Sequence, residues 1–189
     1  MHTQRTEILS PEDYLLREAT ADRRHEYVDG TLYAMTGGTL RHNVVALNVA
    51  SALKSALRDS PCRVFMSDAK LHVARANSYY YPDVMVSCEE RLRELGPEDA
   101  VVSAPVLVVE VLSPATSVID RREKLVAYRR IEALGEYLLI DPDGMRAELH
   151  RRVAGGWEYL RYDPGDAVEL ATLGLTLPAD TLFEGLGPA

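Results

Sequence analysis

The chain has 189 residues, of which 47% are hydrophobic and 26% are charged, as in an ordinary globular protein. This length fits one domain, so we expect a single domain over residues 1–189 with a loose N-terminus over residues 1–9. No run of about 18 uncharged apolar residues occurs, and we expect no membrane-spanning segment. The first residues also lack the apolar stretch of a signal peptide. These features predict a cytoplasmic protein.

The formal net charge of -8 at pH 7 limits the partners that the chain can bind. Lys and Arg give most of the affinity for nucleic acid because they neutralise phosphates, so an acidic chain repels that backbone overall. A nucleic-acid enzyme of this composition needs local basic patches, bound cations or a second subunit. The two cysteines, Cys62 and Cys88, lie in no metal-binding motif. We expect them to be small buried thiols in a reducing compartment.

The first half of the chain predicts short strands around one long helix. A helix begins at Pro11, because Ser10 before it is a favourable N-cap and proline favours the first helical position. Asp29-Gly30 is the turn of a predicted hairpin. Apolar spacing predicts a long helix over residues 41–58 that lies across a sheet. Four strands are then expected, over residues 63–67, 71–74, 79–87 and 105–112.

The second half of the chain adds a helix and further strands. The helix is expected over residues 118–133, with Gly135 as its C-cap residue. A buried strand follows over residues 136–140. An antiparallel meander is then expected from strands over residues 146–152, 157–162 and 168–170. The order of these elements predicts an α/β or α+β fold with a mixed central β-sheet flanked by helices and an antiparallel C-terminal meander.

Two carboxylates occupy unusual positions. Glu110 interrupts an apolar strand typical of the buried centre of a sheet, where an acid is costly unless it is paired, protonated or bound to a metal. The alternative is that Glu110 emerges at a strand end and faces solvent. Asp83 follows Pro82 between strand-forming residues, although Pro-Asp is also a common turn pair. Proline within a strand implies an edge or a bulge, and bulges often lie beside active sites.

Carboxylates on adjacent strands can converge on one cation. Mg²⁺ or Mn²⁺ suits Asp83 and Glu110, because such ions bind through one or two carboxylates and keep several waters. The backbone carbonyl of Val111 is a further candidate ligand. An ion held there lowers the pKa of a bound water and neutralises charge that builds on a phosphodiester.

Five stretches of the sequence resemble the Uma-two family of restriction-type endonucleases, within the PD-(D/E)xK nuclease superfamily. They are HEYVDGTL (25–32), RHNVVALNVASAL (41–53), YPDVMV (81–86), VLVVEVLSPATSVIDRREKLVAYRR (106–130) and EYLLIDPDG (136–144). The stretches YPDVMV and LVVEVLSP are the most specific part. The resemblance implies a restriction-endonuclease-like fold and divalent-metal-dependent phosphodiester cleavage. Asp83 takes the place of the D of the motif and Glu110 that of the (D/E).

The lysine of the motif is displaced. Its expected position is occupied by Leu112, which cannot stabilise transition-state charge or help to activate water. Lys124 in the following helix is the replacement that the family pattern implies. An ion pair between Lys124 and Asp120 is the alternative, since they stand four residues apart. Lys70 is a second contender, and a site in which no lysine serves stays open.

Two further residues are candidates near the N-terminus. Glu26 resembles the N-terminal acid that often joins this metal site. The alternative is a surface residue paired with Arg23 or Arg24. His42 begins the long helix and could contact a substrate phosphate, or it could be structural.

These residues favour a Mg²⁺-dependent endonuclease that hydrolyses DNA as a homodimer, with catalytic candidates Asp83, Glu110, Lys124 and Glu26. Leu112 and the net charge favour an alternative, a catalytically weak or inactive module of the same fold that binds nucleic acid or protein. A glycosidase would also use paired carboxylates, but the chain has few aromatics to stack sugars. The candidate dimer interfaces are Tyr79–Tyr81 and the C-terminal meander.

Overall fold

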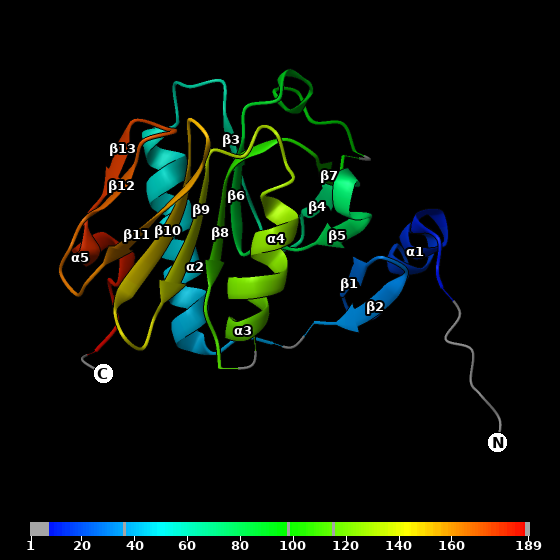
Figure 1. Ribbon diagram of the computed structural model, residues 1–189, viewed down its shortest axis with the longest axis horizontal. Helices are drawn as coiled ribbons and strands as arrows, with labels where there is room; N and C mark the ends of the chain where they lie inside the picture. The colour runs from blue at the N-terminus through cyan, green and yellow to red at the C-terminus, as the bar shows by residue number, and fades with distance from the viewer. Residues whose placement is uncertain (1–7, 36, 98, 115, 188–189) are drawn as a thin grey trace.

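The computed structural model describes residues 8–35, 37–97, 99–114 and 116–187, and within them the strands form three sheets (Figure 1). The six-stranded sheet contains, in spatial order, β11 (Gly156–Tyr162), β10 (Arg146–Val153), β9 (Glu136–Asp141), β8 (Pro105–Val111), β6 (Val84–Ser87) and β3 (Arg63–Met66). The five-stranded sheet contains β2 (Thr31–Ala34), β1 (His25–Val28), β5 (Ser78–Tyr80), β4 (Lys70–Val73) and β7 (Val101–Val102). The third sheet pairs β12 (Val168–Leu170) with β13 (Leu175–Leu177).

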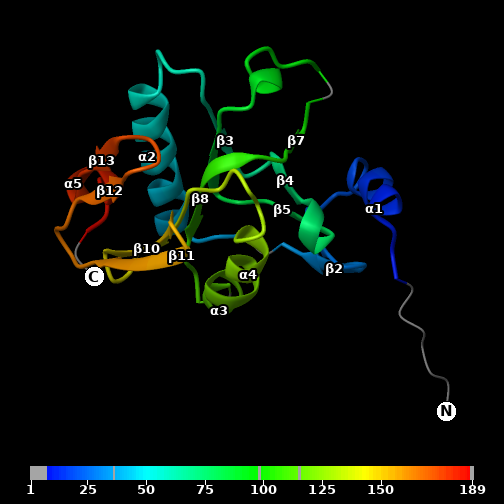
Figure 2. The same ribbon diagram turned by 45° about the horizontal axis from the view of Figure 1, so that its top comes forward.

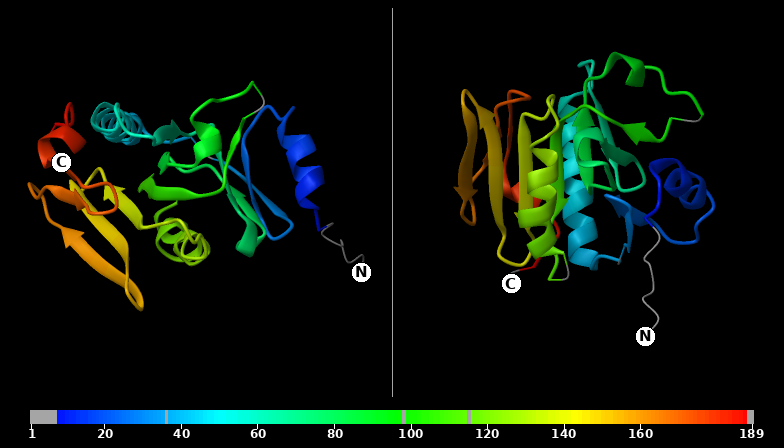
Figure 3. Two further views of the ribbon diagram at one scale, coloured as in Figure 1. Left: turned by 90° about the horizontal axis from the view of Figure 1, so that it is seen from above. Right: turned by 45° about the vertical axis from the view of Figure 1, so that its right-hand side comes forward.

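The helical elements are α1 (Pro11–Glu18), α2 (Leu40–Ala56), α3 (Ser117–Ile119), α4 (Leu125–Tyr128) and α5 (Ala179–Leu182). Between α3 and α4 the chain is π-helical over η3 (Asp120–Lys124), and single 3-10 turns occur at η1 (Ala74–Ala76) and η2 (Glu90–Leu92). Figure 3 shows α2 on one face of the six-stranded sheet and the α3–α4 segment on the other. β8 runs parallel to β9 and antiparallel to β6. The predicted mixed α+β fold with helices flanking the sheet is therefore confirmed.

The long helix α2 forms where its apolar spacing predicts it. Thr39 caps its N-terminus by accepting a hydrogen bond from the backbone N–H of His42 at 3.2 Å. Val45, Val49 and Leu53 are fully buried and belong to the same apolar cluster as the sheet residues beneath them. Burial of this face supplies most of the stabilisation of the helix, since isolated helices are marginal in water.

Strand β8 is buried on both faces, as its apolar sequence predicts. Leu107 and Val109 face α2, whereas Val108 packs into the second core beneath α4. Side chains alternate along a strand, so Glu110 lies on the same face as Val108. Its exposed fraction is only 4%. The alternative in which Glu110 emerges at a strand end into solvent is therefore wrong.

The strand predicted over residues 79–87 is two strands in different sheets. β5 ends at Tyr80 in the five-stranded sheet, and β6 begins at Val84 in the six-stranded sheet. Tyr81, Pro82 and Asp83 form the link between them. Figure 2 shows β4 and β5 of the five-stranded sheet lying between β8 and α1. Proline has no N–H to donate to a ladder, so Pro82 ends one pairing and lets the chain enter the next sheet. Asp83 consequently lies at the junction of the two sheets.

The predicted hairpin is confirmed. Val28 stands opposite Thr31, and the turn residues Asp29 and Gly30 have φ values of 44° and 91°. Positive φ at both central positions is what a tight two-residue hairpin turn requires, and Gly and Asp tolerate it. The N-terminus predicted to be loose over residues 1–9 is ordered at Leu9, because Leu9 is buried and its N–H donates to the carbonyl of Gly30 at 3.1 Å. Residues 1–7 of that prediction lie outside the described residues.

Three details of the second half differ from expectation. The third strand of the predicted meander, β12, pairs with β13 and not with β11. The helix before Gly135 ends at Tyr128, so Gly135 is not its C-cap. A side chain at Gly135 would collide with Thr172, and close packing is therefore the reason for glycine at this position.

The expectation of two free thiols is wrong. Cys62 and Cys88 form a disulfide. They directly flank the antiparallel pair β3–β6, in which Arg63 stands opposite Ser87, and this adjacency brings the two sulfurs together. Among the helices that the structure describes, none has the length and apolarity needed to cross a membrane.

Candidate active site

A cleft of about 430 Å³ opens beside the link between the two larger sheets. Its walls come from the hairpin β1–β2, the first turn of α2, the end of β8 and the π-helical segment η3. The sequence candidates that line it are Glu26, His42, Asp83, Glu110, Val111 and Lys124. Residues more than 80 positions apart in the sequence are thus gathered at one place.

Lys124 lies at the centre of a group of acids. Its Nζ is 3.0 Å from Glu26 Oε1, 3.0 Å from Glu110 Oε1 and 3.3 Å from Asp120 Oδ1. The Lys124–Asp120 pair expected from helical spacing therefore exists, but as one of three ion pairs. Glu26 pairs with Lys124, which excludes the reading as a surface partner of Arg23 or Arg24. The π-helical turn, a form often found at functional sites, carries both Asp120 and Lys124 into the cleft.

Glu110 is held by two donors on one of its oxygens. Lys124 Nζ and the hydroxyl of Tyr128 both donate to Glu110 Oε1, at 3.0 and 2.8 Å. Tyr128 was not a candidate from the sequence, where it reads as an apolar helix residue. The signal that could have found it is its spacing of four residues from Lys124, which places both side chains on one helix face.

Asp83, just before β6, is hydrogen-bonded to the end of β8. Its Oδ2 accepts a hydrogen bond of 2.7 Å from the backbone N–H of Val111, the residue after Glu110. His42 Nε2 lies 3.2 Å from the same oxygen. This hydrogen bond to Asp83 raises the pKa of His42, although burial opposes it. His42 therefore touches an acid of the cleft, whereas its predicted contact with a substrate phosphate stays a prediction.

The electrostatics of the cleft follow from four carboxylates. Glu26, Glu110 and Asp120 pair with the Lys124 ammonium, and Asp83 pairs with His42. Burial raises the pKa of Glu110 well above its ordinary value; Lys124 opposes this shift, and the neighbouring carboxylates add to it. The pKa of Lys124 is also raised, because the attraction of the acids outweighs the cost of burial. Lys124 consequently stays charged, and the cluster carries excess negative charge that a cation would neutralise.

The donor set fits a hard divalent cation. Among the described residues, no three His, Cys, Asp or Glu side chains are arranged as a complete metal cage, but Mg²⁺ usually binds through only one or two carboxylates and keeps waters. Neither Glu110 Oε2 nor Asp83 Oδ1 has a hydrogen-bond partner within the described ranges. Both residues line the cleft, and so does Val111, whose N–H is committed to Asp83.

Lys70, the second lysine contender, is not brought to the carboxylates. Its Nζ lies 5.7 Å from the centroid of the Tyr81 ring, and the residue is not part of the cleft lining. A buried network that the sequence did not indicate lies beside it. Glu18 of α1 accepts hydrogen bonds from the hydroxyl of Tyr81 at 3.0 Å and from the backbone N–H of His25 at 2.9 Å. This network ties α1 and β1 to the wall of the cleft.

A mixed sheet that presents two carboxylates and a lysine at one cleft is the arrangement expected of a restriction-endonuclease-like nuclease. The model of the Uma2 family, described as "Putative restriction endonuclease", matches residues 11–180. The chain therefore belongs to this family of nucleases.

Related proteins agree with this membership. Two proteins of Synechocystis, "Uncharacterized protein slr1290" and "Uncharacterized protein sll1609", are each 36% identical to this chain. The matches cover 94% of this chain and 93% of the first relative, and 78% of this chain and 83% of the second. A solved structure from Anabaena variabilis, described as a putative nuclease belonging to DUF820, superposes with a TM-score of 0.74. That match covers 90% of this chain and 96% of the other at 20% identity, and it shows a shared fold.

Proposed function

We propose that the chain is a magnesium-dependent endonuclease that hydrolyses phosphodiester bonds of DNA. The observation that carries this proposal is the meeting of Asp83 and Glu110 at one cleft. In each carboxylate one oxygen is held by protein donors and the other has no partner among the described residues. Membership of a nuclease family supports the reaction class. The metal and the DNA substrate are inferences from this donor set.

Each residue of the cleft has a distinct task in this proposal. Asp83 and Glu110, with the carbonyl of Val111, would hold Mg²⁺ or Mn²⁺. When bound, such an ion neutralises charge on the phosphodiester and lowers the pKa of a water. Lys124 is placed to stabilise the negative charge that develops as water attacks phosphorus. Glu26 positions the Lys124 ammonium through its 3.0 Å ion pair.

The buried donors keep the two carboxylates in position. His42 and the N–H of Val111 fix one oxygen of Asp83, and Tyr128 fixes one oxygen of Glu110. All of these donors belong to the folded chain, so the fold itself holds the two carboxylates in position. Preorganisation of this kind reduces the reorganisation that accompanies the reaction.

Cleavage of supercoiled plasmid DNA tests the proposal. The wild-type protein is expected to nick plasmid in Mg²⁺ and not in EDTA, and the double variant Asp83→Ala, Glu110→Ala is expected to be slower by roughly 10²-fold or more. A matched control, Asp59→Ala with Glu158→Ala, removes two exposed acids away from the cleft and should cleave as the wild type does. Wild-type rates in the double variant would refute the proposal.

The second candidate is a catalytically weak or inactive module of the same fold that binds nucleic acid or protein. Leu112 at the motif position favours it, and so does the engagement of Lys124 by three acids. An ammonium paired with three carboxylates attracts a substrate phosphate less strongly. This candidate predicts that the same plasmid assay shows binding with no Mg²⁺-dependent nicking.

A further inference from the structure

Two cations that the proposed mechanism does not use, Arg24 and Lys70, do not line the cleft but lie near Tyr81, which does, and we call them the rim cations. The Nζ of Lys70 is 5.7 Å from the centroid of the Tyr81 ring, and the guanidinium carbon of Arg24 is 5.9 Å from the same centroid. Tyr81 lines the cleft. The carbonyl of Arg24 also accepts a 2.9 Å hydrogen bond from the N–H of Met35, another lining residue. Both cations therefore lie within 6 Å of the ring of one residue of the cleft wall.

Lys70 is a half-buried cation with no matching anion. Within the described part of the chain it makes no side-chain hydrogen bond or ion pair. Burial lowers its pKa, Arg24 lowers it further, and Glu18 opposes both. The carboxylate of Glu18 is already engaged by Tyr81 and His25.

Arg24 is only weakly neutralised. Its Nε is 3.5 Å from Asp68 Oδ1, and the Asp68 side chain is 83% exposed, so this ion pair is largely screened by water. The Tyr81 ring, 5.7 and 5.9 Å from the two cations, carries no charge that neutralises either of them. Two like charges partly removed from water are unfavourable unless an anion binds between them.

We propose that Arg24 and Lys70 form a phosphate-binding site that holds the DNA backbone beside the cleft. The proposal rests on the proposed function for the identity of the anion. The guanidinium of arginine presents a planar fork to phosphate oxygens, and the lysine ammonium adds a point charge. Contacts of this kind position a strand without reading its sequence. The phosphate bound here is a neighbour of the one that reacts between Asp83 and Glu110.

This site also answers the objection raised by the net charge of -8. Overall repulsion of the phosphate backbone can be overcome where local cations neutralise individual phosphates. Arg24 and Lys70 supply such a pair on the five-stranded sheet, next to β1 and in β4. The acidic cluster and the basic pair then act on different phosphates of one strand.

Binding of a fluorescein-labelled DNA duplex of mixed sequence, measured by fluorescence anisotropy in EDTA, tests this site without cleavage. The double variant Arg24→Gln, Lys70→Gln is expected to bind about tenfold more weakly, and the slope of log K against log salt should shrink by about 1 to 2. The matched control is Lys54→Gln with Arg58→Gln, which removes two exposed cations from the C-terminal end of α2. It should keep the wild-type affinity and slope.

The variant Arg24→Lys, Lys70→Arg exchanges the two residue types and keeps both positive charges. It should keep the wild-type salt slope, and it therefore separates loss of charge from misfolding. Equal weakening of binding in Arg24→Gln, Lys70→Gln (the rim variant) and in the control would overturn the site. So would unchanged binding in both variants, or no binding of the duplex by the wild type. Plasmid nicking with unchanged affinity in the rim variant refutes this site alone. Binding that depends on the rim cations, without nicking in Mg²⁺, refutes only the proposed function.

Discussion

Glu110, in the middle of a sheet, has more carboxylates than hydrogen-bond donors around it. One ammonium and one hydroxyl donate to it, while the three carboxylates of Glu26, Asp83 and Asp120 repel its charge. A buried carboxylate in such surroundings costs stability in its charged form. The cleft therefore keeps an arrangement that destabilises the fold, as is common at sites that serve a reaction.

This cost gives the unfolding free energy a defined pH dependence. The pKa of Glu110 is raised in the folded state by burial, so its contribution to stability is fully present below the unfolded value near 4.3. That contribution is lost as the pH rises through the folded value. Glu110→Gln keeps the shape of the side chain and removes the charge. We expect it to be more stable than the wild type by about 1–2 kcal/mol at pH 8, with a smaller difference at pH 5.

Urea denaturation at the two pH values measures this difference. Glu148→Gln is a suitable control, because its half-buried side chain pairs with Arg121 and does not line the cleft. It should show no such gain at pH 8. A Glu110→Gln protein that is less stable than the wild type at pH 8 would show that the Lys124 ion pair outweighs burial.

The sequence predicted part of the cleft for a clear reason. Glu110 and Asp83 break strong local patterns, so each could be detected from its immediate neighbours. Tyr128 and Glu18 could not, because a tyrosine on an apolar helix face and an acid at a helix end look ordinary. Their roles depend on contacts with residues 18 and 63 positions away. Such contacts exist only after the sheets and helices have packed.

At the scale of elements, the pair β3–β6 carries Asp83 at one end and the disulfide at the other. The backbone N–H of Ser67, just after β3, donates to the carbonyl of Asp83 at 3.3 Å. Cys62 and Cys88 join the opposite ends of the two strands. β3 is also the edge strand of its sheet. The disulfide therefore fastens the strand that supports the start of β6.

Removal of the disulfide should lower stability. The cysteines are 26 positions apart, and a crosslink that closes a loop of this length contributes about 3 kcal/mol by restricting the unfolded chain. We expect Cys62→Ser, Cys88→Ser to lose about this amount in urea denaturation. A reducing agent should destabilise the wild type to a similar extent and leave the double variant unchanged. No effect of reductant on the wild type would contradict the disulfide.

Elements with strong local signals were predicted well, and those decided by pairing were not. The capped helix α2, the Asp29-Gly30 turn and the apolar strand β8 all follow from local chemistry. The split between β5 and β6 was missed, because the residues on both sides of Pro82 are good strand formers. Which sheet each half joins depends on partners far along the chain. The same reason explains β12, whose partner could not be read from its own residues.

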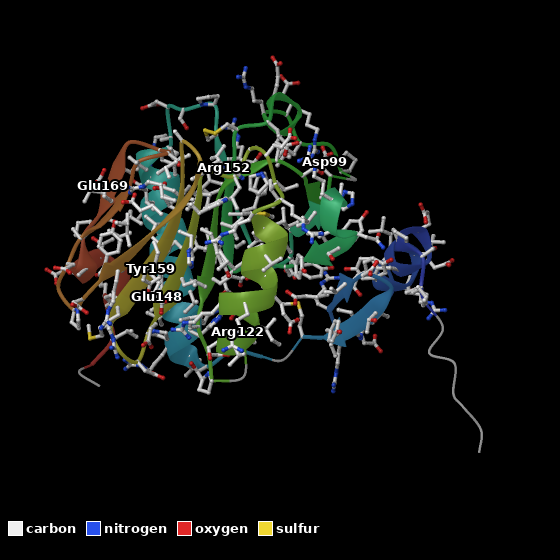
Figure 4. The ribbon with its side chains drawn as sticks, in the orientation of Figure 1. Asp99, Arg122, Glu148, Arg152, Tyr159 and Glu169 are labelled. Atoms are coloured by element: carbon white, nitrogen blue, oxygen red, sulfur yellow. A yellow bond between two sulfur atoms is a disulfide. The ribbon has the colours of Figure 1, made fainter. Side chains whose placement is uncertain are left out.

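At the scale of the whole molecule, the structure excludes one of the two surfaces that we expected to form a homodimer interface. Tyr79, Tyr80 and Tyr81 are buried, with exposed fractions of 7%, 3% and 2%, and so cannot pair with a second chain. The C-terminal meander remains, because β11 is an edge strand and, among the strands that the structure describes, its partner is β10 alone. Figure 4 shows Tyr159 near Glu148 on this part of the molecule, and Tyr159 is 54% exposed.

Light scattering after gel filtration tests the dimer. We expect a mass twice the 21.0 kDa of one chain, and Tyr159→Lys should shift it towards the monomer, since charge on an edge strand blocks pairing. Tyr33→Lys is the control, because Tyr33 is similarly exposed at 51% on β2, the edge strand of the other sheet. It should stay dimeric. A monomeric wild type would contradict the expectation outright.

The short link at Tyr81–Asp83 brings residues of both larger sheets to one cleft. The acids Asp83, Glu110 and Asp120 of the proposed site lie at or beside β6, β8 and η3, whereas Arg24 and Lys70 lie at the five-stranded sheet. A substitution at Arg24 or Lys70 leaves these acids unchanged, whereas one at Glu26 of the same sheet removes an ion pair of Lys124. Homologous chains can therefore differ at Arg24 and Lys70 while they keep Asp83 and Glu110. The two Synechocystis relatives from a single organism are the natural place to compare such divergence.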